Sequence, residues 1–166
     1  MEHNRLLVLF GPPGVGKSYV AEVLARRYGF YFCDFDKDLT PEYEAAVAQG
    51  GVVPEEIRAN QRRYNYERLQ TLIVSHHKVV YAQALFRERL RVEFLELFPW
   101  AEFVLVDTPR ELRVERLEQR TGHPSPLENA MWLGDMFEPV GIPHRVLRND
   151  LSKDDLLTAL AKIVDE

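Results

Sequence analysis

The segment from Gly11 to Ser18, with the sequence GPPGVGKS, constrains the fold more than any other part of the chain. It matches the pattern G-x-x-x-x-G-K-[ST] at every fixed position. The apolar run Leu6–Phe10 precedes it, and a helical pattern from Tyr19 to Arg27 follows it. This order of strand, glycine loop and helix lets backbone N–H groups converge on phosphate oxygens at a helix N-terminus. The sequence therefore predicts a site for a nucleoside triphosphate.

Two side chains of the loop have expected roles in this site. Lys17 can reach the β- and γ-phosphates, and the Ser18 hydroxyl can ligate Mg²⁺. We therefore expect ATP and Mg²⁺ as cofactors. The loop residues expected to bind ATP are Gly11, Pro12, Pro13, Gly14, Val15, Gly16, Lys17, Ser18 and Tyr19.

The pattern of apolar runs predicts an α/β fold. Most of these runs lack apolar/polar alternation, which indicates strands that are covered on both faces. Helical segments lie between them, and Thr40, Thr108 and Ser152 are expected to cap three helices. This alternation predicts a three-layer α/β/α sandwich with a five-stranded parallel sheet, which binds ligands at the carboxyl ends of its strands. The predicted strands are Leu6–Phe10, Phe30–Asp34, Lys78–Ala84, Glu102–Asp107 and His144–Asn149.

Length and composition narrow the class of protein. The 166 residues fit a single domain over residues 1–166, which we expect as a monomer or homodimer. A net charge of −5 and the lack of a long basic run argue against a partner that is a long nucleic acid. No apolar run approaches the roughly 20 residues needed to span a membrane. The single cysteine, Cys33, suits a reducing compartment, so we expect a cytoplasmic protein.

The second predicted strand ends in two carboxylates, Asp34 and Asp36. Residues two apart on an extended chain point to the same side. Such a pair can organise Mg²⁺ and accept a proton from an attacking alcohol. A polar turn is the structural alternative, and which of the two would act as the general base stays open.

The third predicted strand ends without an acidic residue. Its polar residue is Gln83, which can bind a substrate or a metal-bound water, or can be a buried amide satisfied within the fold. Because the third strand offers no carboxylate, we expect Asp34 and Asp36 to supply the carboxylate ligand of the metal.

Three arginines follow the fourth predicted strand along one helical face: Arg113, Arg116 and Arg120. A Gly/Pro segment follows them, which is typical of a lid that closes over phosphates. We expect a lid over about residues 117–135, and we expect Arg116, just before it, and Arg120, within it, to bind ATP. Arg113 fits better as a surface residue paired with glutamates.

Two further positions are candidates. The connection between the second and third predicted strands is long, which favours a substrate-covering insertion over about residues 37–76. Within it, Arg58 can bind an anionic substrate or lie on the surface. Asn149, after the last predicted strand, is a candidate for binding the nucleotide near its base, or simply forms a turn.

Together these residues resemble the small P-loop kinases of metabolites, above all the gluconate kinase and shikimate kinase families. The loop and the Asp34–Asp36 pair are similar to both families. The spacing from Asp34 to Arg58 resembles the shikimate kinases. The segments QAL from Gln83, RLEQRTGH from Arg116 and FEP from Phe137 resemble the gluconate kinases.

The resemblance implies a fold like that of the nucleoside-monophosphate kinases, with a mobile lid. It also implies that Asp36 binds the substrate hydroxyl, Asp34 supports Mg²⁺, Arg120 contacts the ATP phosphates and Arg116 lies against the adenine. The chain departs from the shikimate kinases at Ala82–Ala84, where they have a Gly-rich segment. It departs from the gluconate kinases at Leu39–Pro41, where they have His-Pro after the acidic pair. The resemblance thus supports the reaction class rather than either substrate.

We therefore expect an ATP-dependent phosphotransferase that acts on a hydroxyl of a small metabolite, such as a sugar acid or a cyclic polyol acid. Lys17, Asp36 and Arg120 are the expected catalytic residues, and Asp36, Arg58 and Gln83 the expected substrate-binding residues. A kinase of polynucleotide 5′ ends or of nucleosides is one alternative. A non-catalytic ATP-binding regulatory module is the other.

Overall fold

The computed structural model describes residues 4–120, 127–150 and 152–166. Its sheet contains five strands, all parallel, in the order β2-β3-β1-β4-β5. This arrangement confirms the predicted sheet. The strands are β1 (Arg5–Phe10), β2 (Tyr31–Phe32), β3 (Lys78–Gln83), β4 (Glu102–Asp107) and β5 (Arg145–Arg148).

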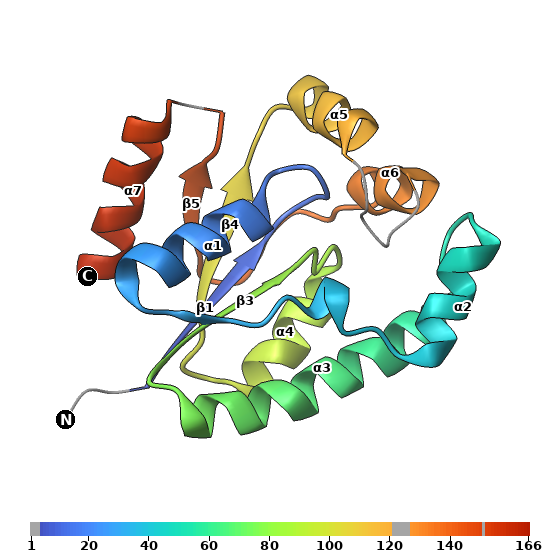
Figure 1. The fold of residues 1–166 in the computed structure, drawn as a ribbon, viewed down its shortest axis with the longest axis horizontal. Helices are drawn as coiled ribbons and strands as arrows, with labels where there is room; N and C mark the ends of the chain where they lie inside the picture. The colour runs from blue at the N-terminus through green and yellow to red at the C-terminus, as the bar shows by residue number, and fades with distance from the viewer. Residues whose placement is uncertain (1–3, 121–126, 151) are drawn as a thin grey trace.

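Helices cover both faces of the sheet, as Figure 1 shows. On one face, Leu7 and Leu9 of β1 pack with apolar residues of α1 (Lys17–Tyr28) and α7 (Lys153–Asp165). On the other face, Val8 of β1 packs with residues of α3 (Glu55–Ser75) and α4 (Glu88–Leu97). Because every second residue of β1 faces a different buried layer, the strand is apolar throughout. The predicted three-layer α/β/α sandwich is confirmed.

Three more helices lie near the carboxyl ends of the strands: α2 (Pro41–Gln49), α5 (Arg110–Gln119) and α6 (Leu127–Asp135). Figure 1 shows α6 between α5 and α2. The region expected to be an insertion, about residues 37–76, contains α2 and α3. The region expected to be a lid, about residues 117–135, contains the end of α5 and all of α6, while its residues 121–126 lie outside the described part.

Two of the three predicted helix caps are confirmed. The side chain of Thr40 accepts a hydrogen bond from the amide of Tyr43, and that of Ser152 accepts one from the amide of Asp155. The prediction for Thr108 is wrong: Pro109 occupies the N-cap of α5. The buried Thr108 hydroxyl lies instead within 3.3 Å of the carbonyl oxygen of Val15 and 3.4 Å of that of Asn149, so it joins the phosphate loop to the end of β5.

The second strand is shorter than predicted. β2 ends at Phe32, and a 3-10 turn, η1 (Phe35–Lys37), follows it. Asp34 precedes this turn, and its carboxylate accepts a hydrogen bond from the amide of Asp36 at 3.1 Å. An Asp side chain often ends extended structure in this way, because it satisfies a backbone donor locally. Among the described helices, none is long and apolar enough to cross a membrane.

Candidate active site

The phosphate loop connects β1 to α1, and two of its glycines explain its shape. Gly14 and Gly16 have φ values of +89° and +90°, a left-handed conformation that other residues rarely adopt. A Cβ atom on Gly14 would lie 2.7 Å from the carbonyl oxygen of Arg113. The glycine pattern therefore serves two purposes: it turns the loop, and it lets α5 pack directly against it.

Lys17 begins α1 and folds over the loop. Its Nζ atom donates to the carbonyl oxygens of Gly11, at 2.9 Å, and Pro12, at 3.1 Å. Burial lowers the pKa of this ammonium to about 8; the charge of Asp36 opposes the shift, and that of Arg120 adds to it. The cation of Lys17 thus lies in a poorly solvated position, where its attraction for phosphate is strong.

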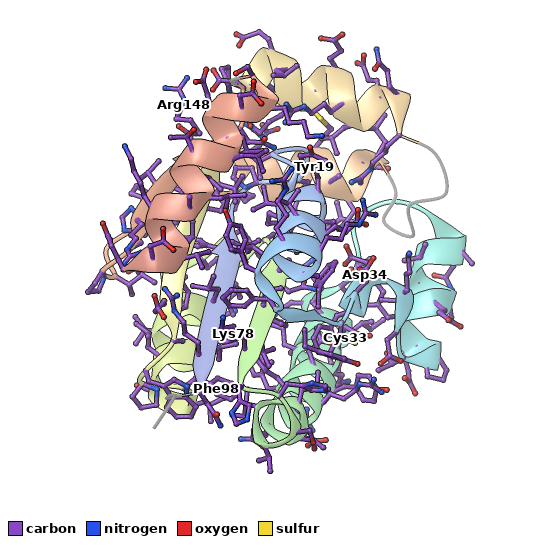
Figure 2. All side chains as sticks on the ribbon, turned by 60° about the vertical axis from the view of Figure 1, so that its left-hand side comes forward. Tyr19, Cys33, Asp34, Lys78, Phe98 and Arg148 are labelled. Atoms are coloured by element: carbon purple, nitrogen blue, oxygen red, sulfur yellow. The ribbon has the colours of Figure 1, made fainter. Side chains whose placement is uncertain are left out.

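A cavity of about 290 Å³ opens at the loop. It brings together residues predicted from separate segments: the loop, the acidic turn, the end of β3 and α5. The predicted site residues that line it are Pro13, Gly14, Gly16, Lys17, Ser18, Tyr19, Asp36, Gln83, Arg116 and Arg120. In Figure 2, Tyr19 lies in the upper part of the molecule and Lys78, which begins β3, lies well below it, so this site is toward the carboxyl ends of the strands.

The two predicted arginines of α5 have different surroundings. Arg116 donates to the backbone carbonyl of Asn149 at 2.8 Å and also contacts the carbonyl oxygens of Gly14 and Val15. Arg120 follows the last turn of α5, and its buried Nη2 atom has no hydrogen-bond partner within the described part of the chain. Burial lowers the pKa of Arg120, and the charge of Asp36 opposes this shift. Arg116 therefore supports the loop, whereas Arg120 lines the cavity and leaves its buried Nη2 donor without a partner among the described residues.

A second cavity of about 80 Å³ adjoins the first. Asp36 and Gln83, both predicted site residues, line the two cavities together with Tyr43, Ala84 and Leu133. The second cavity extends from this junction to Arg58, Gln61 and Arg62 on α3. The arrangement offers one compartment beside the phosphate loop and another beyond Asp36.

Arg58, the predicted substrate-binding arginine, is only 8% exposed. Its Nη1 atom donates to the carbonyl of Val53, and its Nη2 atom donates to Glu55 at 2.6 Å. The guanidinium also lies 4.6 Å from the ring centroid of Trp132 on α6. Its Nε atom is buried without a hydrogen-bond partner within the described residues, although Arg58 lines the second cavity.

Glu55 neutralises part of this basic cluster. Its carboxylate contacts Arg58, Arg62 at 2.9 Å and Arg89 at 3.0 Å. Although desolvation opposes the change, hydrogen bonds from Arg62 and Arg58 lower the pKa of Glu55 to about 2. The carboxylate is therefore ionised at neutral pH and holds Arg58 in position.

Asp34 and Asn149 lie at the edges of the site. Asp34 is not among the described residues that line either cavity; its carboxylate bonds the amide of Asp36 and lies 3.8 Å from Nζ of Lys37. Figure 2 shows Asp34 on the side of α1 that faces α2. Asn149 donates from Nδ2 to the carbonyl of Val15 at 2.7 Å, so its amide holds the loop.

Asn149 also borders a third, open cavity of about 370 Å³. Tyr19, Arg116 and Lys153 line this cavity too. The cavity adjoins Gly16 of the loop, and Asp36 is not among the described residues that line it. A nucleotide bound through its phosphates at the loop has room here for its base.

Besides Ala84, two residues that line both main cavities were not predicted from the sequence. Tyr43 lies in α2, and burial raises the pKa of its hydroxyl. Leu133 lies in α6. Neither belongs to a motif, and a tyrosine or leucine in an amphipathic helix gives no signal that distinguishes a site from a core.

Comparison with known proteins agrees with this geometry. A family model described as an AAA domain matches residues 6–140. The chain belongs to this AAA-domain family of P-loop proteins.

Curated relatives of this AAA-domain protein are kinases. A gluconokinase from Gluconobacter oxydans (strain 621H) is 32% identical over 123 residues, which cover 72% of this chain and 67% of the relative. A shikimate kinase from Streptomyces coelicolor is 36% identical over 75 residues, which cover 45% of this chain and 43% of the relative. The resemblance derived from the residues is thereby confirmed.

Solved structures share the fold over nearly the whole chain. A sugar kinase from Janibacter sp. HTCC2649 superposes with a TM-score of 0.79 and 22% identity, covering 98% of this chain and 95% of that one. A gluconokinase from Sinorhizobium meliloti 1021 gives a TM-score of 0.76 at 22% identity, with 98% and 94% covered. The relatives and the loop together assign the chain to the ATP-dependent kinases of small metabolites, and they do not favour the polynucleotide-kinase or regulatory alternatives.

Proposed function

We propose that the protein transfers the γ-phosphate of ATP, with Mg²⁺, to a hydroxyl of a small polyhydroxylated metabolite, such as a sugar acid or a cyclic polyol acid. The observation that carries this proposal is the position of Asp36 and Gln83 at the junction of the two cavities. ATP occupies the cavity at the phosphate loop, and the acceptor occupies the cavity beyond Asp36. The reacting hydroxyl then meets the terminal phosphate between them.

The donor set at the loop fits Mg²⁺. The Ser18 hydroxyl and the Asp36 carboxylate line the same cavity, and both offer the oxygen ligands that Mg²⁺ prefers. Among the described residues there is no cluster of three or more His, Cys, Asp or Glu that would cage a metal by itself. Mg²⁺ commonly binds through one or two protein oxygens together with phosphates and water, so this sparse set is sufficient. The ion would neutralise phosphate charge, and Asp34 would support it indirectly through its bond to the amide of Asp36.

The remaining chemistry depends on positioning and charge. Phosphoryl transfer passes through a loose transition state, and the enzyme mainly aligns the reactants and stabilises the negative charge of the phosphoryl oxygens. Lys17 and Arg120 supply cations on the loop side, and Asp36 orients the acceptor hydroxyl and takes its proton. Gln83 and Arg58 would bind other oxygens of the acceptor, while Arg116 and Asn149 flank the nucleotide base.

Lys17→Ala tests the assignment when it is combined with a screen of acceptors. The screen measures ATP-dependent phosphorylation of sugars, sugar acids, cyclic polyols and nucleosides by the wild type. For the acceptor that is found, we expect Lys17→Ala to lower kcat/KM by about a hundredfold or more, because the variant lacks the cation beside the γ-phosphate. Lys162→Ala, in the last turns of α7, is the matched control and should keep full activity.

Two results would contradict the proposal. One is transfer by Lys17→Ala at the wild-type rate. The other is ATP hydrolysis by the wild type that no member of the acceptor panel changes, because a kinase needs an acceptor to complete its reaction.

A further inference from the structure

A continuous series of contacts runs from the phosphate loop to the acceptor cavity through α5 and α6. It begins where Arg116 of α5 contacts the carbonyl oxygens of Gly14 and Val15. The carbonyl of Arg113 approaches Gly14 so closely that only a glycine fits there. The loop and α5 are therefore closely packed.

Side-chain contacts in turn join α5 to α6. A Cβ atom on Gly134 would lie 3.0 Å from Nη1 of Arg113, so the backbone of α6 at Gly134 lies beside the end of the Arg113 side chain from α5. Arg110 and Asp135 form an ion pair at 3.5 Å across the same pair of helices. These contacts connect α5 to α6.

α6 then reaches the acceptor side through two residues. The amide of Val53 donates to Oδ1 of Asn129 at 3.1 Å, and this hydrogen bond is buried. One turn along α6, the ring of Trp132 packs against the Arg58 guanidinium at 4.6 Å. Phe86 packs edge-on against Trp132, with 5.5 Å between the ring centroids, and contacts the same guanidinium.

From these contacts we infer that Asn129 and Trp132 are positioning residues that couple the nucleotide site to the acceptor site. Both hold the segment from Val53 to Arg58, which leads into α3, against α6. ATP that binds the loop and Arg120 orders α5 and α6, and α6 then fixes Arg58 in the acceptor cavity. This inference rests on the proposed function, because it takes the second cavity to be the acceptor site.

The coupling has a reciprocal consequence. If the nucleotide favours the arrangement in which Arg58 is fixed, the acceptor must favour nucleotide binding by the same factor. Leu133 lies on α6 between Trp132, which contacts Arg58, and Gly134, which contacts Arg113. It lines both cavities, so a ligand in either cavity would lie beside it.

The hydrogen bond of the Val53 amide provides a direct measurement. Hydrogen exchange at Val53 is followed with and without Mg²⁺ and AMPPNP, a non-hydrolysable ATP analogue, and calorimetry establishes that AMPPNP binds. In the wild type we expect AMPPNP to slow exchange at Val53 by about tenfold, since exchange reports local opening. The amide of His76, which bonds the carbonyl of Leu72 at the far end of α3, is the internal control and should not change.

Substitutions at Trp132 test the role of its ring. We expect Trp132→Leu to bind AMPPNP but to reduce the slowing at Val53 to about twofold, because the cation–π contact is lost. Trp132→Phe keeps an aromatic face and should restore most of the effect. Trp100→Leu, at an exposed tryptophan remote from α6, should behave as the wild type.

Different experimental results would contradict this inference and the proposed function. Bound AMPPNP with unchanged exchange at Val53 in the wild type would overturn the coupling, as would a full response in Trp132→Leu. The wild-type measurement decides the question even if Trp132→Leu does not fold. Absence of AMPPNP binding to the wild type would instead contradict the nucleotide site, and with it both proposals.

Discussion

Lys17 illustrates how a single side chain is tuned by its surroundings. The loop removes its ammonium from water and gives it two carbonyl partners, those of Gly11 and Pro12. Two arginines, Arg113 and Arg120, act against its charge, and Asp36 acts in favour of it. Because desolvation dominates, the pKa falls from 10.5 to about 8, and the residue titrates close to physiological pH.

This shift predicts how activity depends on pH. Lys17 carries its charge below about pH 8 and loses it above, so we expect kcat/KM for ATP to fall as the pH rises through 8. The value of kcat/KM reports the free enzyme, where the lowered pKa applies. An arginine keeps its charge to higher pH, so Lys17→Arg should lose the alkaline decline even if its overall rate is lower. A wild-type profile that stays flat to pH 10 would contradict the burial of this charge.

Gly14 is needed both for the phosphate loop and for the packing of α5 against that loop. We expect Gly14→Ala to cost about 1–3 kcal/mol of the free energy of unfolding, from its backbone conformation and its contact with Arg113. ATP affinity should fall at the same time, because α5 must move away from the loop. Urea denaturation and calorimetry measure the two effects.

Gly50→Ala is the matched control for this prediction. Gly50 also has a positive φ, +76°, but a Cβ there would meet no atom within 4 Å. Its substitution should therefore cost about 1–3 kcal/mol through backbone strain alone, because φ +76° with ψ 178° is a conformation that other residues rarely adopt, and should leave ATP affinity unchanged. Equal losses of ATP affinity in the two variants would refute the packing role of Gly14.

At the scale of elements, a buried arginine joins α4 to the segment before β5. Arg91 is fully buried, and it donates to the carbonyls of Leu85 at 2.8 Å, Glu138 at 2.9 Å and Pro139 at 2.9 Å. It also pairs with Glu88 at 2.8 Å. Leu85 lines the second cavity, so this arginine fixes one wall of that cavity.

Removal of Arg91 should be strongly destabilising. We expect Arg91→Leu to lower the free energy of unfolding by about 3–5 kcal/mol, because Glu88, the buried carbonyl of Leu85 and the partly buried carbonyls of Glu138 and Pro139 would lose their partner. The half-exposed neighbour Arg89 provides the comparison, and Arg89→Leu should cost about 1 kcal/mol or less. If chemical denaturation gave similar losses for both, Arg91 would not connect these elements.

The elements also show what the sequence could and could not predict. The five strands and the caps at Thr40 and Ser152 follow from local patterns, and the structure confirms them. The predicted cap at Thr108 was wrong. Its hydroxyl stands in the right local pattern for a cap, but it contacts carbonyl oxygens of the loop and of the end of β5 instead. Local signals cannot reveal such a contact between residues that are distant in the chain.

Some residues of the candidate site could likewise be predicted from the sequence, and others could not. The loop, Asp36, Gln83 and Arg120 could be predicted, because their residue types at strand and helix ends are typical of phosphate chemistry. The contacts of Arg58 with Glu55 and Trp132 could not, since an arginine in a helix gives no sign of which aromatic ring or carboxylate the fold brings to it. Tyr43 and Leu133 were missed for the same reason.

At the scale of the whole molecule, the parallel sheet brings the ends of β1, the acidic turn after β2 and the end of β3 to one edge. The helices α2, α3 and α6 then contribute residues to the second cavity. The molecule therefore has two compartments with Asp36 between them. Separate compartments for the two reactants are what direct transfer of a phosphoryl group to an acceptor requires.

Asp36→Asn provides the most direct test of this division. Calorimetry with Mg²⁺ and ATP is combined with a measurement of phosphate transfer to the acceptor found by screening. We predict that the variant binds ATP within a few-fold of the wild type, because Lys17, the loop amides and the Ser18 hydroxyl remain and the asparagine carbonyl still offers an oxygen to Mg²⁺. It should transfer phosphate at least about a hundredfold more slowly, because an amide cannot take the proton of the acceptor hydroxyl. Wild-type transfer by Asp36→Asn, or loss of ATP binding together with transfer, would contradict the account of Asp36 as the residue that receives the acceptor.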